Sequence, residues 1–592
     1  MRKVFSNQEI ARVLSEIGEY LAMQDVPFKP RAYEKVAVAI EGFEENVSEL
    51  YGKGGIKALE EIPGVGASIA EKIEELITTG KLKYYEQLKK RTPVDLGTLS
   101  SIEGMGPKSV KKLYQKLHVR NLEDLEKAAR SGKVKKLEGF GAKSEENILK
   151  GIEFLKSSGG RFALGSVLPQ ARLLEERLSK VKGVSKVVVA GSVRRWKETI
   201  GDVDILAVAD NSSRIMDYFV RMPEVKRVFA KGATKSMVKL SSGLDVDLRV
   251  VPAQSYGAAL NYFTGSKDHN VALRQRAIKM GYKLNEYGLF RRQATSDKRQ
   301  GWKMIAGRTE EELYKALRLS YIEPELRENT GEIEAAAGKK LPSLVGYSDL
   351  KGDLQVQTDW SDGSDSIETM AKAAAARGLV YIAITDHTKR LAMTHGLDEK
   401  RILKQMSEID RVNKKLQVSG IKCHVLKGTE CDILKDGSLD LSDEALSKLD
   451  VVGVSVHSLF NLSRKEQTAR IVRAMNNPHV DILFHPTGRI INKRKPYDVD
   501  MDEIIKTAKQ TGTILEIDAY PDRLDLKDEH IRKCVAAGVR MSIDSDAHSP
   551  AHFPVLEFGI AQARRGWAGK DDIVNTQSLV KLREIPKKRR GS

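Results

Sequence analysis

Pairs of aspartates recur in two strand-like segments in the middle of the sequence. Asp202 and Asp204 are spaced i, i+2 in GDVDILAV, and Asp245 and Asp247 have the same spacing in LDVDLRVV. Residues two apart on a strand point to one face, so each pair lines one side of its strand. Pairing the two strands would bring three or four carboxylates together. Such a cluster is unstable without cations, and phosphoryl transfer requires divalent ions held by carboxylates.

A segment rich in glycine and arginine lies just before the first aspartate pair. Gly191-Ser192 suits a phosphate nest, and Arg194-Arg195 suits guanidinium clamps. For isolated aspartate pairs, two amphipathic strands with solvated acidic faces would be a competing interpretation. The combination instead favours Mg²⁺ or Mn²⁺ bound beside a phosphorylated substrate.

Residues of metal-ligand type stand at the ends of β-rich runs in the carboxy-terminal part. These runs alternate with helical patterns, which is typical of a parallel α/β barrel or layered sheet. Active sites gather at the carboxyl ends of such strands. A single histidine there is more often a hydrogen-bonded core or surface residue, but the recurrence favours a metal site. The candidates are Asp362, His387, Glu430, His457, His485, Asp546 and His548.

Three Gly-x-Gly turns lie in the amino-terminal part, within residues 62–66, 102–106 and 137–141, and helical patterns follow them. In a helix-hairpin-helix, the N–H groups of this turn and of the next helix face a DNA phosphate. A helix C-cap explains a lone turn equally well, but three in a basic chain favour DNA binding without sequence readout. The glycines expected at the DNA are Gly64, Gly66, Gly104 and Gly106.

The charge balance also favours a polyanionic partner. The 592 residues include 99 Lys and Arg and 81 Asp and Glu, for a formal net charge of +18. Nucleic acid is the first candidate. An anionic membrane surface is the alternative, but no long amphipathic basic helix supports it. Since the sequence lacks a long apolar run and an apolar signal core, we expect a soluble, unsecreted protein. Cys423, Cys431 and Cys534 are expected to be buried thiols.

The middle of the chain resembles family X DNA polymerases, the relatives of polymerase beta. GSVRRWKETIGDVD resembles their nucleotidyltransferase signature, and YFTGSKDHNVALRQRAIKMGYKLNEYGLF resembles their thumb. The resemblance implies that Asp202 and Asp204 bind both metals. It also implies that Asp247 binds the catalytic metal and helps to deprotonate the primer 3′-hydroxyl.

The same resemblance implies a set of contacts to the incoming dNTP. The triphosphate would contact Ser192, Arg195 and Gly201. The sugar would lie against Tyr262, Phe263 and Gly265, which would exclude a 2′-hydroxyl. The nascent pair and template would be sensed by Asn270 and Arg274. Lys267 stands where polymerase beta has an acidic residue, and we hypothesise that it raises nucleotide affinity and lowers selectivity.

The stretch IPGVGASIAEKIEELITTGKLKYYEQL resembles the amino-terminal lyase domain of polymerase beta. Lys72 matches the lysine that forms a Schiff base with an abasic sugar, although by position alone it would be a solvated helix lysine. Lys29 and Tyr33 match residues that hold the 5′-phosphate of a gap. Ser68 stands where polymerase beta has a further lysine, which predicts a weaker phosphate pocket.

The carboxy-terminal part resembles the polymerase-and-histidinol-phosphatase (PHP) domain, a distorted β/α barrel that hydrolyses phosphoesters with up to three metals. In bacterial and archaeal family X polymerases this domain supplies 3′–5′ exonuclease activity. Its first motif, Asp-Leu-His-x-His-Thr, here has Gln355 and Gln357 in place of both histidines. An amide is a poor ligand for Zn²⁺ or Mn²⁺, so we expect one metal site to be lost, a residual site to remain, and the exonuclease to be weak or absent. A natural scaffold and a deliberately exonuclease-deficient variant both fit.

The resemblance covers nearly the whole chain and implies a multidomain α+β and α/β protein. The expected domains are a lyase-like helical domain (1–92), a second helix-hairpin-helix domain (93–155), a palm (156–250), a thumb (251–321), a linker (322–345) and a PHP barrel (346–592). We expect a monomeric, cytoplasmic, nucleoid-associated prokaryotic enzyme that binds dNTPs and gapped or primer–template DNA.

The leading interpretation is a template-directed polymerase that fills short gaps in base excision repair, with a lyase function in addition. One alternative is a phosphoesterase with DNA-binding helices attached, which Gln355 and Gln357 oppose. The other is a non-catalytic scaffold that binds gaps, which the intact aspartates oppose.

Overall fold

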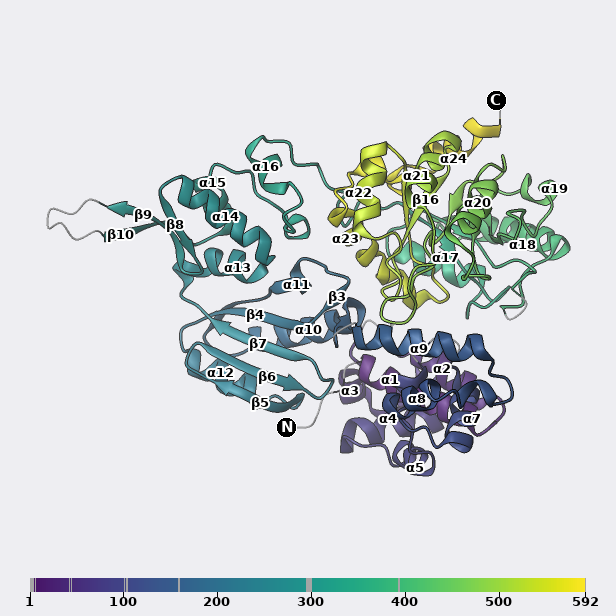
Figure 1. Cartoon of the computed structure of the whole chain (residues 1–592), viewed down its shortest axis with the longest axis horizontal. Helices are drawn as coiled ribbons and strands as arrows, with labels where there is room; N and C mark the ends of the chain where they lie inside the picture. Colours follow the sequence, from purple (N-terminus) through teal and green to yellow (C-terminus); the bar gives the residue numbers. More distant parts are fainter. Residues whose placement is uncertain are drawn as a thin grey trace. The chain divides into compact units, whose positions relative to one another are not determined.

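The computed structural model describes residues 5, 7–41, 43, 45–100, 102, 105–157, 160–293, 301–391 and 394–590 (Figure 1). The chain divides into two compact units. One is Arg161–Leu344, and the other contains the described residues up to Gly160 and those from Val345 onward. In the described part of the chain, no helix is long and apolar enough to cross a membrane.

The amino-terminal part is helical, as predicted. Its α-helices are α1 (Asn7–Met23), α2 (Lys29–Glu41), α3 (Val47–Glu60), α4 (Ala67–Thr79), α5 (Lys83–Arg91), α6 (Leu96–Ser100), α7 (Pro107–Leu117), α8 (Leu122–Arg130) and α9 (Ala142–Ser157), with a 3₁₀ helix, η1 (Val134–Lys136), between the last two. Gly66 and Gly106 are the residues directly before α4 and α7. Gly64 has φ +81°, a conformation that favours glycine. Gly104 lies outside the described residues.

A five-stranded mixed sheet forms the first half of the unit Arg161–Leu344. Its strand order is β2-β4-β7-β6-β5. The strands are β2 (Val184–Val189), β4 (Asp202–Ala209), β5 (Val225–Lys231), β6 (Lys235–Leu240) and β7 (Asp245–Val250), and a separate small pair is β1 (Phe162–Ala163) with β3 (Thr199–Ile200). The helices are α10 (Leu164–Ser179), α11 (Gly191–Arg194), α12 (Ser212–Val220) and η2 (Ala253–Ser255). Buried and half-exposed residues alternate along β6 and β7, so one face of the sheet packs on the core.

Helices and a small antiparallel sheet complete this unit. They are α13 (Tyr256–Thr264), α14 (Lys267–Lys279), β8 (Tyr282–Asn285), β9 (Gly288–Gln293), β10 (Gly301–Ala306), α15 (Glu310–Ala316), η3 (Pro324–Leu326) and α16 (Glu332–Ala337). The segment interpreted as a linker carries two fully buried charged residues, Arg327 and Glu332. It therefore packs into the unit instead of running free.

Seven parallel strands in the order β11 to β17 form the carboxy-terminal barrel. A bridge between Val356 and Ala547 joins the first strand to the segment after the last, which nearly closes it. All residues of β11, β12, β14 and β17 are buried, as expected for strands covered on both faces. The fold class predicted from the sequence is confirmed.

The barrel strands are β11 (Gly352–Val356), β12 (Tyr381–Ile384), β13 (His424–Asp432), β14 (Val451–Ser455), β15 (Ile482–Leu483), β16 (Ile514–Asp518) and β17 (Met541–Asp544). Their helices are α17 (Ile367–Ala376), α18 (Glu399–Val418), α19 (Asp443–Leu446), α20 (Arg464–Met475), α21 (Met501–Thr511), α22 (Asp528–Ala537), η5 (Pro550–Val555), α23 (Leu556–Arg565), η6 (Lys570–Asp572), η7 (Val574–Thr576) and α24 (Leu579–Arg590).

Candidate active sites

The two aspartate pairs lie side by side in the five-stranded sheet. β4 and β7 run parallel, and their register pairs Asp202 with Asp245 and Asp204 with Asp247. Val203, between the two aspartates of β4, is fully buried. The alternation of the strand therefore turns the carboxylates to the face opposite the apolar core.

Burial and repulsion govern the charge state of this group. Burial first, and then the charges of Asp202 and Asp247, raise the pKa of Asp204 from 3.8 to about 7. Lys235 on β6 holds Asp247 at 2.9 Å between its Nζ and Oδ2. Carboxylate oxygens are the ligands that Mg²⁺ and Mn²⁺ prefer, and a nearby cation favours the ionised form. The residues present therefore fit the divalent ions that the sequence predicts.

The carboxylate oxygens of the aspartates on β4 and β7 are not close enough together to form a cluster of three metal ligands. In the part of the chain that the structure describes, three ligand atoms lie within 4.8 Å of one another only in the carboxy-terminal barrel. Asp247 would have to turn away from Lys235 to share an ion with Asp202 and Asp204.

Gly191 allows the turn after β2 to reach the carboxylates. It has φ +63°, and a Cβ atom there would lie 2.5 Å from Oδ2 of Asp204. The backbone N–H of Ala190 donates to the carbonyl of Asp204 at 2.8 Å. Ser192 follows in the same turn, where its carbonyl accepts the N–H of Lys197 at 3.0 Å. Only glycine combines this conformation with so close an approach, which fixes the turn beside the aspartates.

Arg195, predicted to contact the triphosphate, forms a hydrogen bond next to Gly265, which was predicted to contact the sugar. Its Nε donates to Glu328 at 3.0 Å, and its guanidinium also donates to the carbonyl of Thr264. Gly265 comes next with φ +67°, and a Cβ there would lie 3.2 Å from the Arg195 guanidinium. Gly201 precedes the first aspartate, and a Cβ there would lie 3.1 Å from the guanidinium of Arg161.

The residues predicted at the sugar and the nascent pair lie on α13 and α14. The rings of Tyr262 and Phe263 meet edge to face at 5.1 Å. The guanidinium of Arg249, on β7, lies 4.6 Å from the Phe263 ring. The side-chain amide of Asn270 donates to the Tyr262 carbonyl at 2.7 Å. Arg274 is exposed one turn further along α14, on the same side as Asn270.

A buried charge network supports this region, and the sequence reasoning missed it. Arg194 pairs with Glu310 at 2.7 Å, and Glu310 pairs with the fully buried Arg327 at 2.5 Å. Arg194 also donates to the hydroxyl of Thr264 at 2.7 Å. Arg194 and Glu310 stand 116 positions apart, so no spacing rule pointed to the network.

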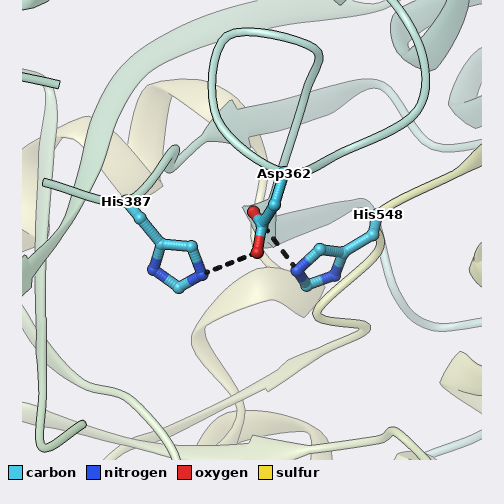
Figure 2. Close-up of side chains that lie close together, drawn as sticks. All are labelled: Asp362, His387 and His548. Atoms are coloured by element: carbon cyan, nitrogen blue, oxygen red, sulfur yellow. Dashed lines mark ion pairs between the residues drawn. The ribbon is translucent and has the colours of Figure 1, made fainter. Parts of the chain in front are cut away.

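In the barrel, the predicted ligands gather at the carboxyl-terminal side of the strands: Glu430 lies near the end of β13, and the others follow their strands. Asp362, His387 and His548 form one group of converging ligand atoms, and His387, Glu430 and His457 form a second. Figure 2 shows Asp362 between the two histidines of the first group. The Nε2 of each histidine lies 3.7 Å from an oxygen of the Asp362 carboxylate. His387 belongs to both groups, with its Nε2 toward Asp362 and its Nδ1 3.3 Å from Glu430.

The remaining predicted ligands adjoin these groups. His485 Nε2 lies 2.8 Å from Glu430, and His548 Nδ1 lies 3.8 Å from Asp546. Burial alone would raise the pKa of Glu430, but His387 and His457 hold it well below its usual value. Burial would lower the pKa of His457, but Glu430 raises it to about 9, so Zn²⁺ or Mn²⁺ binding to this donor set of carboxylate and imidazoles would displace a proton.

The two glutamines of the first barrel motif face this cluster from β11 and the residue after it. Gln357 donates its amide to Glu430 at 2.9 Å. Its Oε1, and both side-chain polar atoms of Gln355, are buried without a hydrogen-bond partner among the described residues. Arg523 lies close by, 3.4 Å from Asp518 and 3.8 Å from Asp546. This side of the barrel site thus contains two amides where the motif would supply imidazoles, and the Arg523 guanidinium lies beside Asp518 and Asp546.

Four segments of the chain match protein families. Residues 5–82 match the helix-hairpin-helix domain, 96–153 the SAM-like helix-hairpin-helix tandem, 259–328 the DNA polymerase beta thumb and 353–519 the PHP domain. Over 97% of its length the chain is 36% identical to the DNA polymerase/3′-5′ exonuclease PolX of Bacillus subtilis (strain 168), of which it covers 98%. The chain belongs to the family X DNA polymerases that carry a PHP domain.

Two further relatives each match a part of this family X polymerase. DNA polymerase lambda of Arabidopsis thaliana is 26% identical over 50% of the chain and 57% of its own length. A probable phosphatase of Thermoanaerobacter pseudethanolicus is 28% identical over 38% of the chain and 89% of its own length. The family predicted from the sequence is confirmed.

The helical domain of this family X polymerase holds Lys72 on α4. Its Nζ donates to the carbonyl and hydroxyl oxygens of Ser68 at 2.8 and 2.9 Å, and lies 5.3 Å from the Tyr84 ring. Burial first lowers the pKa of Lys72, and the charge of Lys29 lowers it further. Lys29 is exposed at the start of α2, whereas Tyr33 is only 6% exposed, so its ring packs in the core.

Proposed function

We propose that this family X polymerase fills short gaps during base excision repair, adding dNTPs to a primer 3′-hydroxyl opposite a template. The observation that carries the proposal is the parallel register of β4 and β7, which sets Asp204 beside Asp247 with Asp202 two residues before Asp204. We also propose that the protein acts as a monomer on gapped or primer–template DNA.

In this proposal the three aspartates hold Mg²⁺ or Mn²⁺, which when bound would stabilise the charge on the transferred phosphoryl group. Asp247, released from Lys235, would help to accept the proton of the primer hydroxyl. The raised pKa of Asp204 supports the assignment, because it marks a carboxylate that needs a nearby cation to ionise fully at neutral pH.

The dNTP would lie between the turn after β2 and the end of α13. Ser192, Arg195 and Gly201 would bind the triphosphate, and Glu328 would fix the orientation of the Arg195 guanidinium. The sugar would contact Tyr262, Phe263 and Gly265, and the nascent pair and template would contact Asn270 and Arg274. Lys267, exposed at the start of α14, would raise dNTP affinity. Unchanged KM and misinsertion in Lys267→Ala would contradict that role.

Primer extension on a one-nucleotide gap with a 5′-phosphate tests the polymerase proposal. Asp247→Ala should lower extension by at least about 10²-fold, while DNA binding is retained. Asp245→Ala is the matched control, because this carboxylate is held by Lys239 at 2.6 Å on the neighbouring strand. Degradation without extension, or extension that survives Asp247→Ala, would contradict the proposal.

We propose a second activity, a 5′-deoxyribose phosphate lyase with Lys72 as nucleophile. Its lowered pKa supports this, since a Schiff base requires the neutral amine. Borohydride should trap the chain covalently on DNA with an incised abasic site. Lys72→Ala should lose the adduct, and Lys83→Ala, an exposed lysine nearby, should keep it. An adduct that persists in Lys72→Ala would rule out this nucleophile.

We further propose that the barrel retains Zn²⁺ or Mn²⁺ at its Asp362–His387–His548 group but has a weak or absent 3′–5′ exonuclease. The amide of Gln357 already engages Glu430, and amide oxygens are poor ligands for these ions. The double variant Gln355→His/Gln357→His should gain Mn²⁺-dependent degradation of single-stranded 3′ ends.

A third substitution, added to that double variant, distinguishes nuclease activity of the barrel from a contaminating nuclease. His485→Ala should remove the gained nuclease activity, because His485 contacts Glu430 at 2.8 Å. Brisk degradation by the unchanged chain, lost on His485→Ala, would show that the glutamines do not impair the barrel.

A further inference from the structure

One face of the three-stranded sheet in the thumb carries an exposed aromatic ring between two cations. In the β9–β10 register, Trp302 lies opposite Arg292 and Met304 opposite Phe290. In the β8–β9 register, Lys283 also lies opposite Phe290. Because alternate residues of a strand share a face, and cross-strand partners share it too, Lys283, Arg292 and Trp302 project from the same side.

The side chains of Lys283 and Arg292 flank the Trp302 ring but leave much of it exposed. The Nζ of Lys283 lies 6.0 Å from the centroid of Trp302, and the guanidinium carbon of Arg292 lies 5.9 Å from it. Trp302 is 43% exposed, and both cations are exposed. Cation–π attraction at exposed sites is weak, so it does not by itself explain a tryptophan in this position.

The surroundings of the ring are strongly basic. Among the described residues from Arg274 to Arg308, the single acidic residue is Glu286. The basic residues there are Arg274, Arg276, Lys279, Lys283, Arg291, Arg292, Lys303 and Arg308. The β9–β10 hairpin projects away from α13, α14 and α15 (Figure 1). This charge complements a polyanion, and a half-exposed indole complements unpaired bases.

We propose that this face binds a single-stranded stretch of DNA, with one base stacked on Trp302 and the adjoining phosphates contacted by Lys283 and Arg292. Duplex DNA keeps its bases stacked in its interior, so the ring would add little to duplex binding. The inference rests on the proposed gap-filling function for the source of this strand, the unpaired template across a gap longer than one nucleotide.

Binding of the full chain to short oligo(dT) and to a duplex of equal length, followed by fluorescence anisotropy, tests the proposal. Trp302→Ala should weaken oligo(dT) binding by about fivefold or more and change duplex binding by less than about twofold. Trp302→Tyr should retain most of the affinity, because a ring remains for stacking. Ile305→Ala, an exposed apolar residue on the same strand, is the control.

Two adjacent arginines provide a matched test of the cations. Arg292 flanks the ring, whereas Arg291 projects from the opposite face of β9. Each alanine variant removes one charge, but only Arg292→Ala should lower oligo(dT) affinity beyond its effect on duplex DNA. An equal effect of the two variants on oligo(dT) would contradict a site centred on Trp302.

The assay separates this inference from the polymerase proposal, since it requires no nucleotide addition. Asp247→Ala should bind oligo(dT) like the unchanged chain even though it does not extend a primer. Unchanged oligo(dT) affinity in Trp302→Ala, or equal losses on oligo(dT) and duplex, would overturn the inference. If Trp302→Ala fails to fold in thermal unfolding, weak oligo(dT) binding by a folded Arg292→Ala still supports the site, and unchanged binding by it overturns the site.

Discussion

Replacing Asp204 by asparagine should stabilise the metal-free protein and abolish nucleotide addition. Asparagine keeps the shape of the carboxyl group without its charge. In the metal-free protein, burial and the charges of Asp202 and Asp247 disfavour the ionised form of Asp204. Because asparagine carries no negative charge, the variant should avoid this repulsion and fold more stably. For lack of the same charge, it should not hold a divalent cation.

The size of the effect follows from the pKa of Asp204, which folding raises from 3.8 to about 7. Because folding raises this pKa, Asp204 does not destabilise the fold below pH 3.8, where it is protonated in both the folded and the unfolded states. The free energy of unfolding then falls as the pH rises through 7. Relative to a neutral side chain, the aspartate costs about 4 kcal/mol at pH 8 and about 2 kcal/mol at pH 5.

Thermal unfolding in EDTA at these two pH values measures the difference. For a unit the size of Arg161–Leu344, each kcal/mol moves Tm by about 2–4 °C. Asp204→Asn should thus raise the Tm of this unit by up to about 8–16 °C at pH 8 and by about half as much at pH 5. Added Mg²⁺ should raise the Tm of the unchanged chain alone. Asp245→Asn, whose carboxylate is 48% exposed, should shift Tm little.

A Tm gain of equal size at pH 5 and pH 8 would mean that asparagine improves packing and that charge repulsion is not the cause. No gain at pH 8 would mean that Asp204 is not electrostatically disfavoured in the metal-free protein.

Three further results are expected. Gly191→Ala should destabilise the chain by about 1–3 kcal/mol and slow single-turnover incorporation, because a Cβ there meets the Asp204 carboxylate at 2.5 Å. Glu310→Gln should lower the stability of its unit by about 3–5 kcal/mol in denaturant unfolding, because the fully buried Arg327 would lose its ion-pair partner. His387→Ala should reduce bound Zn²⁺ or Mn²⁺, measured by elemental analysis, more than His548→Ala, because His387 belongs to both ligand groups.

Local periodicity made much of the fold predictable. The spacing of Asp202 and Asp204 determined which face of β4 they occupy, and the same rule placed Asp247 beside them once the two strands paired. The barrel strands were predictable because buried parallel strands are short apolar runs that end in polar residues. Gly66 and Gly106, expected in turns, directly precede helices.

Contacts between residues distant in sequence could not be predicted. Nothing local indicated that Lys235 would hold Asp247, or that Glu328 would hold Arg195, because each pair depends on how separate elements pack. The buried Arg327 lies in the segment that was predicted to be a linker, residues 322–345. Arg327 can be buried because it is paired with Glu310. A pairing between two separate elements leaves no pattern in the sequence of either one.

The alternation of aspartate and apolar residues along β4 also bears on how the central strands find each other during folding. If β4 slipped by one residue against β7, Asp202 and Asp204 would turn into the core and Val203 would turn to solvent. Burying two ionised carboxylates costs far more than exposing a valine. The residues proposed to hold the catalytic ions therefore also penalise strand mispairing. A chain with apolar residues at these positions would lose catalysis. It would also lose the energetic penalty that disfavours a shifted strand register.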